Sequence, residues 1–350
     1  MSVTINDVAE LAGVSPMTVS RVINGGQRVR ADTRQRVEQA ISQLGYVPNA
    51  LARGLSSQRA GTLALIVPDV ANPFFTLIVR GAESVARRAG YRMILCNTDS
   101  DLDREQEYVQ EMLAHRVEGL LIAPASDRSL RHLRAVERQQ VPYVLIDRTI
   151  EGLECDLVQG DNVGGARRLV EHLAGLGHRR IALLGGEAEI STTRDRLRGF
   201  RQGLADAGIA AEPALEIFSK YEISGGVTAA RQMLELPNLP SAVIAVNNMV
   251  AVGVIKALHE RGLDVPGDMA LACFDDIEYA SLMNPFLTVM SQPAESFGTL
   301  ATQLLLERLD GRASDQRRQV VLAPELIVRV SCGAQRGSPR PTGAALRAPS

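Results

Sequence analysis

The chain has 350 residues and a net charge of −2, from 38 Lys and Arg against 40 Asp and Glu. Hydrophobic residues make up 45% of it and charged residues 22%, proportions that exclude an intrinsically disordered chain and a membrane-embedded one. The length predicts two large domains, or one large domain with a small appendage.

Charge is distributed unevenly along the chain. Residues 1–60 carry seven Arg and four acidic residues, a net of +3, whereas residues 61–330 carry 28 basic and 36 acidic residues, a net of −8. The last 20 residues carry three Arg and no acid. A basic head on an acidic body is the charge segregation that nucleic-acid binding requires. The near-neutral total therefore does not exclude a nucleic-acid partner.

Residues 4–45 predict three short helices. Thr4 and Asp7 come close to a capping box at the start of the first helix, and Ser15 caps the second, which begins with Pro16. Each helix, the third spanning about 32–44, has an apolar stripe at helical spacing, formed by Val8, Leu11 and Ala12, by Val19, Val22 and Ile23, and by Val37, Ala40, Ile41 and Leu44. The tight turn between the first two is typical of a helix-turn-helix, whose second helix enters the DNA major groove. The spacing alone fits an ordinary helical hairpin equally well.

The segment after these helices predicts one more helix, of marginal stability. Pro48 ends the third helix and Asn49 can cap a new one, but only about two turns follow before Ser and Gly dominate. So short a helix, with Gly54 inside it, is marginal in isolation, and we expect it to be ordered only when something holds it. We assign residues 1–48 to the helix-turn-helix domain and 49–60 to this helix and a linker.

From residue 61 onward, nearly continuous apolar runs alternate with amphipathic helical stretches. The strand candidates are residues 63–67, 93–95, 119–122, 143–146, 181–184, 242–246 and 269–274. Such runs are typical of parallel strands buried on both faces. They fall into two blocks, 61–160 and 161–290, which predict two doubly wound α/β lobes within one domain at 61–330. Residues 331–350, rich in Gly, Pro and Ser, are expected to form a disordered tail.

Polar side chains follow four of these strands closely. They are Asn72, Asp147 with Arg148, Asn247 with Asn248, and Asp275 with Asp276. Polar groups at the C-terminal ends of parallel strands point into the cleft between lobes, where ligands bind. The alternative role for an Asp at such a position is to cap the next helix, and we favour capping for Asp161 and Asp276.

Several segments closely resemble the lactose-repressor (LacI) family. They are DVAELAGVSPMTVSRVIN at 7–24, GYVPN at 45–49, Ala52-Arg53, VPDVANPFF at 67–75, GHRRIA at 177–182, RLRGF at 196–200 and FDD at 274–276. The resemblance covers residues 4 to about 330. It implies a small all-α helix-turn-helix head and a two-lobed, periplasmic-binding-protein-like α/β domain that binds an effector and dimerises. It further implies a ligand-responsive repressor that binds a palindromic operator as a homodimer.

The resemblance implies a set of DNA-contacting residues. They are Thr4, Ser15, Pro16, Met17, Thr18, Ser20, Arg21, Asn24, Ala52 and Leu55. Pro16, Met17 and Arg21 are the base-reading positions, and the Ser, Thr and Asn residues around them are expected on phosphates. Arg21 can donate two hydrogen bonds to a guanine edge and Met17 can touch a thymine methyl group, whereas Pro16 is also explained as a first helical residue. Leu55 is expected as the apolar wedge of a hinge helix in the minor groove; its alternative is a linker leucine.

The resemblance also places an effector in the cleft between the lobes. Its candidate contacts are Phe74, Asp147, Arg148, Arg196, Tyr221, Asn247, Asp275 and Gln292. Arg196, Asn247 and Asp275 are the strongest candidates for hydrogen bonds to hydroxyls or a carboxylate, and the two aromatic rings can stack on a sugar face. These groups favour a small sugar or sugar acid, and a nucleobase-responsive corepressor system is the alternative. Asn248 departs from the family, which usually carries Asp there.

The sequence lacks the patterns of several other kinds of chemistry. The four cysteines, Cys96, Cys155, Cys273 and Cys332, lie far apart without a companion His at ligand spacing, so we expect no metal site. No nucleophile–base motif is present, and we expect neither enzymatic activity nor a cofactor. The histidines, His115, His132, His172, His178 and His259, are interpreted as scattered residues at helix ends.

The first residues lack a secretory signal, and no apolar run approaches the roughly 20 residues that span a bilayer. We therefore expect a cytoplasmic protein without membrane contact. This absence, together with the DNA-binding head, argues against a periplasmic sugar-binding protein, which would share the two-lobed body. The C-terminal 20 residues contain no apolar heptads, so a dimer is expected rather than a tetramer.

Overall fold

The computed structural model describes residues 3–23, 29–46 and 61–334. The chain forms two compact units, Met1–Gly61 and Thr62–Ser350, which we call the head and the body and describe separately.

The head consists of three helices around a small apolar core. They are α1 (Ile5–Ala12), α2 (Pro16–Ile23) and α3 (Ala31–Leu44). Asp7 accepts a hydrogen bond from the Thr4 N–H at 2.7 Å and donates its own N–H to Thr4 Oγ1 at 3.4 Å, which completes the capping box. The core is formed by Val8, Ala9, Ala12, Val19, Val22, Val37 and Ala40. Leu11, which the sequence places in this stripe, is 48% exposed, and Ala9 takes its place.

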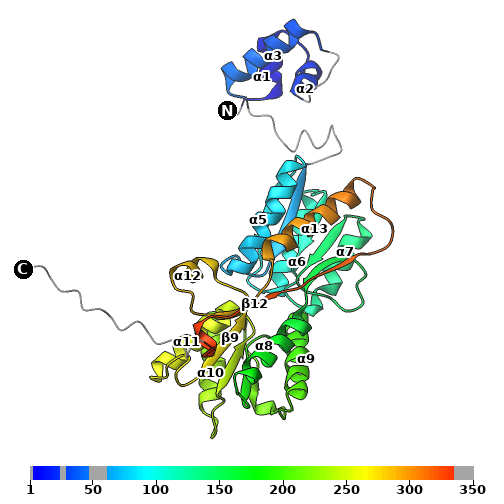
Figure 1. The fold of residues 1–350 in the computed structure, drawn as a ribbon. Helices are drawn as coiled ribbons and strands as arrows, with labels where there is room; N and C mark the ends of the chain where they lie inside the picture. The colour runs from blue at the N-terminus through cyan, green and yellow to red at the C-terminus, as the bar shows by residue number, and fades with distance from the viewer. Residues whose placement is uncertain (1–2, 24–28, 47–60, 335–350) are drawn as a thin grey trace, which may run out of the picture. The chain divides into compact units, whose positions relative to one another are not determined.

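The body contains two six-stranded sheets within residues 61–334, each covered by helices (Figure 1). Lobe one has the strand order β11-β5-β4-β3-β1-β2, with every pair parallel. Its elements are β1 (Thr62–Val67), α5 (Pro73–Arg88), β2 (Arg92–Asn97), α6 (Leu102–Ala114), β3 (Gly119–Ile122), η1 (Asp127–Ser129), α7 (Leu130–Arg138), β4 (Tyr143–Ile146), β5 (Asp156–Gly160), α13 (Ala294–Leu309) and β11 (Gln319–Leu322).

Alternation along the strands builds a core on each face of the lobe-one sheet. Leu63 and Leu65 of β1 pack with residues of α5 and α13, whereas Ala64 and Ile66 pack with residues of α6 and α7. Successive side chains of a strand point to opposite faces, so an uninterrupted apolar run is what a sheet with two covered faces requires.

Lobe two has the strand order β12-β10-β9-β8-β6-β7, in which only β12 is antiparallel to its neighbour. Its elements are α8 (Asn162–Gly175), β6 (Ile181–Leu184), α9 (Ser191–Asp206), η2 (Pro213–Leu215), β7 (Glu216–Ile217), α10 (Ile223–Leu234), β8 (Ala242–Ala245), α11 (Asn248–Glu260), β9 (Ala270–Phe274), α12 (Glu278–Met283), β10 (Thr288–Ser291), β12 (Glu325–Ile327) and η3 (Val330–Cys332). Helix α8 packs against α9, and α10 against α11. The predicted fold class, a helical head with two doubly wound lobes, is confirmed.

The chain passes between the lobes three times within residues 61–334. It crosses from β5 to α8, returns from β10 to α13, and crosses again from β11 to β12. The first two crossings lie side by side, because a Cβ on Gly160 would come within 2.0 Å of Gln292 Oε1. The two sequence blocks therefore do not correspond fully to the two lobes, since α13 and β11 complete lobe one.

The predicted tail begins later than residue 331. Ser331 and Cys332 are buried, and the Ser331 hydroxyl donates to the Leu271 carbonyl at 2.6 Å and accepts the Thr288 N–H at 2.8 Å. These contacts tie the last described turn to β9 and β10, so the boundary at 331 is wrong. Residues 335–350 lie outside the described residues.

A buried carboxylate joins three separate parts of lobe one. Asp156, at the start of β5, is inaccessible to solvent and accepts hydrogen bonds from both Arg308 of α13 and Arg318 before β11, at 2.8–3.0 Å. Burial alone would raise the pKa of Asp156, but the hydrogen bonds from these two arginines hold it below the ordinary value of 3.8. Asp156 therefore fastens the returning C-terminal elements to the sheet.

Candidate functional site

Helix α2 presents an exposed face that includes the three predicted base-reading residues. Pro16 and Arg21 are exposed and Met17 is 64% exposed, while Val19 and Val22 on the opposite face are buried. An Arg21 Nη2 group contacts Met17 Sδ at 3.5 Å. The two side chains best suited to touch base edges therefore lie together, one turn apart, on the face that is free of the head's core.

The other predicted DNA contacts differ in their surroundings. Ser15 Oγ accepts the Thr18 N–H at 3.3 Å and lies 3.0 Å from Thr18 Oγ1, so Ser15 caps α2 as predicted. Thr4 is exposed, but its hydroxyl belongs to the α1 capping box. Ser20 is half-buried. The remaining predictions, Asn24, Ala52 and Leu55, and the hinge helix itself lie outside the described residues.

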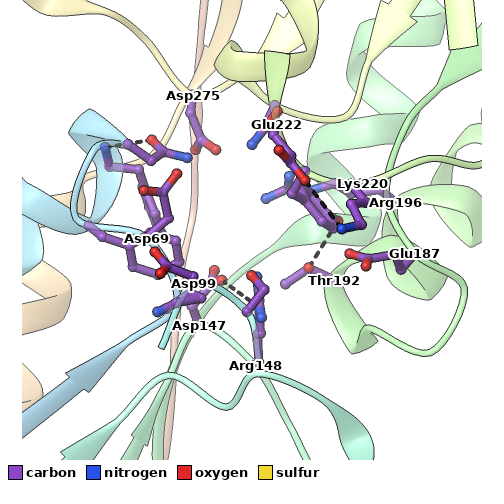
Figure 2. Close-up of a pocket in the computed structure, with 17 residues that line it drawn as sticks. Asp69, Asp99, Asp147, Arg148, Glu187, Thr192, Arg196, Lys220, Glu222 and Asp275 are labelled. Carbon is purple, nitrogen blue, oxygen red and sulfur yellow. Dashed lines mark hydrogen bonds and ion pairs between the residues drawn. The ribbon is translucent and has the colours of Figure 1, made fainter. Parts of the chain in front are cut away.

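A pocket of about 370 Å³ lies between the two lobes of the body (Figure 2). Seven of the eight predicted effector contacts line it, namely Phe74, Asp147, Arg148, Arg196, Tyr221, Asn247 and Asp275. The eighth, Gln292, lies behind the wall and donates to Asp275 Oδ1 at 2.8 Å. These residues come from sequence positions 74–292 and meet because parallel strands end at a common edge of each sheet.

Asp147 and Asp275 occupy equivalent places in the two lobes. Each immediately follows a strand, β4 or β9, and each has a left-handed backbone, with φ of 66° and 63°. Both are about 5% exposed. Burial raises the pKa of Asp147 against the opposing effect of Arg196 and Arg148, and burial raises that of Asp275 to about 6 against Arg196 and Gln292. Backbone strain and raised carboxyl pKa values concentrate at functional sites.

Two arginines enter the pocket from opposite lobes, and each is anchored by carbonyl groups. Arg148 donates from Nη1 to the Pro124 carbonyl at 2.8 Å, and its guanidinium carbon lies 5.7 Å from the centre of the Tyr221 ring. Arg196 donates from Nε to Asn162 Oδ1 at 2.8 Å and from Nη1 to the Val246 carbonyl, and it stacks 4.1 Å over the ring of Phe274. Fixed cations of this kind orient a polar ligand.

Two buried polar atoms of pocket residues have no hydrogen-bond partner among the described residues. They are Asp147 Oδ1 and Arg148 Nε. Buried polar groups in folded proteins are nearly always paired. Arg148 Nε lies 3.9 Å from Asp147 Oδ2 as an ion pair, so Asp147 Oδ1 is the one of the two atoms without a charged partner.

Aromatic rings stand on opposite walls of the pocket. In lobe one, Phe74 packs edge-on against Phe75 and Phe297, with ring centres 5.2 Å and 5.6 Å apart. In lobe two, the Tyr221 hydroxyl bonds Thr193 Oγ1 at 2.8 Å and Thr192 Oγ1 at 3.2 Å. Flat apolar faces thus lie among the charged groups, as in sites for ligands that have both apolar and polar surfaces.

The asparagines at the strand ends also cap helices. Asn72 Oδ1 accepts the Phe74 N–H at 3.0 Å at the start of α5, and Asn247 Oδ1 accepts the Val250 N–H at 2.8 Å at the start of α11. Asp161 caps α8 by accepting the Gly164 N–H, as predicted. The same prediction is wrong for Asp276, whose carboxylate instead pairs with Arg329.

The sequence analysis missed several charged residues of the pocket wall. They are Asp69, Asp99, Glu187, Lys220 and Glu222. With the predicted groups they give the wall six carboxylates and three cations, and burial raises the pKa of Glu187 against the effect of Arg148 and Lys220. Asp69 lies within the VPDVANPFF run, and Asp99 and Glu187 follow predicted strands as closely as Asn72 does, so strand position could have found them. Lys220 and Glu222 lie in a loop that no predicted strand precedes.

His132 lies in the first turn of α7, near a helix end as predicted. It is 5% exposed and contacts the buried carboxylate of Glu105. Among the described residues, no group of three His, Cys, Asp or Glu side chains is placed to hold a metal ion. No helix of the described ranges is long and apolar enough to cross a membrane.

Two family profiles match the chain. Residues 4–49 match "Bacterial regulatory proteins, lacI family", and residues 170–332 match "Periplasmic binding protein-like domain". The first match covers the helical head, and the second covers most of lobe two together with α13 and β11 of lobe one.

Curated relatives match over nearly their whole length. The "Ribose operon repressor" of Escherichia coli (strain K12) is 36% identical over 328 residues, covering 94% of this chain and 99% of the relative. The "HTH-type transcriptional repressor PurR" of Photobacterium profundum is 34% identical over 329 residues, covering 94% and 98%. Among solved structures, the lac repressor dimer bound to operator and the anti-inducer ONPF is similar with a TM-score of 0.81 and 31% identity, over 95% of this chain and 99% of that chain. Both the helical head and the two-lobed body are covered by these matches, and the chain belongs to the LacI family of bacterial transcriptional regulators.

Proposed function

We propose that the protein is a transcriptional repressor that binds a palindromic operator. Its affinity for this operator is controlled by a small sugar or sugar acid bound between the lobes of its body. The observation that carries this proposal is the presence, in one chain, of an exposed DNA-reading helix face at Met17 and Arg21 and of a polar pocket at the strand ends of two lobes. The proposed activity is regulation by binding, with no catalytic step.

The operator is read by two heads of a homodimer. A single small head offers few phosphate contacts, and joining two heads through their bodies multiplies affinity through effective concentration. The lac repressor structure similar to this chain is a dimer on operator. Effector binding changes the relative position of the lobes and thereby the presentation of the paired heads. Coupling is reciprocal, so DNA and effector change one another's affinity by the same factor.

The pocket favours an effector rich in hydroxyl groups. Asp147 and Asp275 offer acceptors, Arg148 and Arg196 offer donors, and Phe74 offers an apolar face. The similar Escherichia coli protein is named a ribose operon repressor, so D-ribose is the first ligand to test. The alternative, a nucleobase corepressor, calls for a flat apolar slot, whereas this wall carries nine charged residues.

The test uses the full-length protein and an operator selected from random duplex DNA. Thermal shift is measured with D-ribose, a pentonic acid, adenine and hypoxanthine, because a ligand of the folded state raises the melting temperature by mass action. The expected result is a shift with a sugar or sugar acid, and a change of at least fivefold in operator affinity by fluorescence anisotropy. A response to the purines alone would favour the corepressor alternative, and failure to enrich any DNA sequence would overturn the regulatory function.

A further inference from the structure

A buried acid–imidazole pair lies in lobe one away from the pocket. Glu105 of α6 is inaccessible to solvent and His132 of α7 is 5% exposed, and Glu105 Oε1 lies 2.5 Å from His132 Nε2. Neither residue lines the effector pocket. Burying a charged or polar pair is costly unless each group is satisfied, and such a pair is weak evidence for stability alone.

The second oxygen of Glu105 holds a loop. Glu105 Oε2 accepts the N–H of Ala125, which lies between β3 and η1. Residues 123–125 of this loop are buried. A buried backbone N–H without a partner is costly in free energy. The Glu105 carboxylate therefore fixes the position of residues 123–125 relative to the sheet.

The same loop anchors a pocket residue and contacts the other lobe. The carbonyls of Pro124 and Ala125 accept Arg148 Nη1 at 2.8 and 3.4 Å. Two residues further on, Asp127 pairs with Arg194 of α9 in lobe two. The other contacts of the Arg148 guanidinium in the described structure are longer, namely the ion pair with Asp147 at 3.9 Å and the Tyr221 ring at 5.7 Å. The two carbonyls are therefore its only hydrogen-bond acceptors among the described residues.

We propose that Glu105 and His132 are positioning residues for the effector site. His132 orients the Glu105 carboxylate, Glu105 fixes Ala125, and the carbonyls of the Pro124–Ala125 segment then place Arg148 in the pocket. The pair acts on the effector through Arg148 and touches no ligand itself. This inference rests on the proposed function only in the measurement of ligand affinity; the exchange measurement described below does not depend on the ligand.

The chain offers a matched control. Tyr143 donates from its hydroxyl to Glu137 Oε1 at 3.0 Å and so ties the same helix, α7, to the beginning of β4. Tyr143→Phe removes one partly buried hydrogen bond in the same lobe, at the end of β4 opposite to Asp147. Glu105→Gln is the conservative variant, because its amide oxygen can still accept the Ala125 N–H.

The experiment measures hydrogen–deuterium exchange of the full chain without ligand, and the Kd for D-ribose by calorimetry. Glu105→Ala is expected to speed exchange in residues 123–127 and 147–149 and to raise the Kd tenfold or more. Glu105→Gln should stay within threefold of wild type in Kd, and Tyr143→Phe should leave both measurements unchanged. If Glu105→Ala does not fold, His132→Asn replaces it, with at least a threefold rise in Kd and the same exchange pattern expected.

The outcomes separate this inference from the proposed effector. If the wild-type protein does not bind D-ribose, the ribose proposal fails, and exchange in residues 147–149 decides the positioning role by itself. A folded Glu105→Ala protein whose residues 147–149 exchange at the wild-type rate would overturn the positioning role, even if α6 and α7 loosen. Equal loosening of residues 147–149 in Tyr143→Phe would overturn it as well, because any loss of packing in the lobe would then suffice.

Discussion

Asn248 at the start of α11 donates a hydrogen bond from Nδ2 to Asn72 Oδ1 at 3.2 Å, and so links lobe two directly to lobe one beside the pocket. The same amide group lies 3.3 Å from the Asp276 carbonyl, while Asn248 Oδ1 has no partner among the described residues. Thr149 N–H and Ser191 Oγ form a second direct link between the lobes at 2.9 Å. Together with the ion pairs of Asp127 with Arg194 and of Arg128 with Glu189, these uncharged hydrogen bonds hold the lobe arrangement around the pocket.

Replacing Asn248 by Ala should weaken effector binding with little loss of stability. The variant removes the amide that donates to Asn72 and to the Asp276 carbonyl, and it also removes the unpaired Oδ1. Asn72 still accepts the Phe74 N–H. Loss of one hydrogen bond worth about 1 kcal/mol predicts a roughly fivefold higher Kd. Calorimetry with the effector found by thermal shift measures this change. An unchanged Kd would show that the bond does not contribute to the ligand-bound arrangement.

Effector affinity should depend on pH through Asp275. Burial raises its pKa to about 6, and an ionised carboxylate accepts hydroxyl hydrogen bonds better than a protonated one. Affinity should therefore be nearly constant above about pH 7 and fall about tenfold between pH 7 and pH 5. Because the folded pKa lies above the ordinary 3.8, Asp275 also lowers the stability of the free protein as pH rises from about 4 to 6. Calorimetry across this range tests the first effect, and Asp275→Asn should flatten the profile.

Arg196→Ala should abolish the effector response and leave operator binding intact. The variant removes the guanidinium that lies over Phe274 and leaves Asn162 Oδ1 without its donor, at a cost of about 1–3 kcal/mol in stability. The matched control is Arg198→Ala on the same helix, because that side chain is exposed and pairs only with Asp195 in the described structure. Operator anisotropy with and without effector gives the answer. A normal response from the Arg196 variant would remove this residue from the site.

Asp156→Asn should destabilise the body by about 3–5 kcal/mol at neutral pH, because it leaves two arginines without their buried counter-charge. The pKa of Asp156 is held below 3.8, so its stabilising effect is present above that pH and is lost as pH falls through the folded pKa. Urea unfolding followed by circular dichroism measures the change. Asp310→Asn, at an exposed pair with Arg312, should cost less than about 1 kcal/mol. Equal losses in both variants would contradict the role of burial.

Arg21→Ala should relax operator sequence preference at one base pair. A bidentate contact to guanine contributes about 1–3 kcal/mol of discrimination, and Arg21 is exposed on α2 beside Met17. The wild-type protein and the Arg21→Ala variant should both lose operator affinity steeply with added salt, because their phosphate contacts remain. Repeating the DNA selection with the variant tests this, with Arg80→Ala in the body as control. An unchanged consensus would show that Arg21 contacts only the backbone.

The sequence predicts the elements whose patterns are local. All seven predicted strands are present. Six of them have apolar runs that reflect burial on both faces, whereas β2 is an edge strand on which Ile94 and Leu95 are exposed. Strands β5, β7 and β11 were not predicted. Strand β5 begins with Asp156, whose charge is paired with two arginines distant in sequence, and β7 has only two residues. Strand β11 is partly exposed, and its partner in the sheet lies about 160 residues away. Such pairings depend on tertiary contacts that no local pattern records.

The pocket was predictable where residues follow strands or match the family's motifs. Asp147, Asn247 and Asp275 satisfy the first condition, and each lines the pocket. Lys220 and Glu222 lie in a loop that no predicted strand precedes, so neither periodicity nor strand position marks them. The burial of Glu105 with His132 was also invisible, because a polar residue in a helix is ordinarily on the solvent side and only its distant partner makes burial tolerable.

The threefold passage of the chain between the lobes means that neither lobe is a continuous stretch of sequence. Residues 62–160 lack α13 and β11, and therefore lack the helix that covers one sheet face and the two arginines that neutralise Asp156. A chimaera that exchanges lobe one with a relative must carry residues 62–160 together with 294–322. Inheritance of ligand specificity by recombination is correspondingly constrained, because a single crossover point cannot transfer half of the pocket as a folded unit.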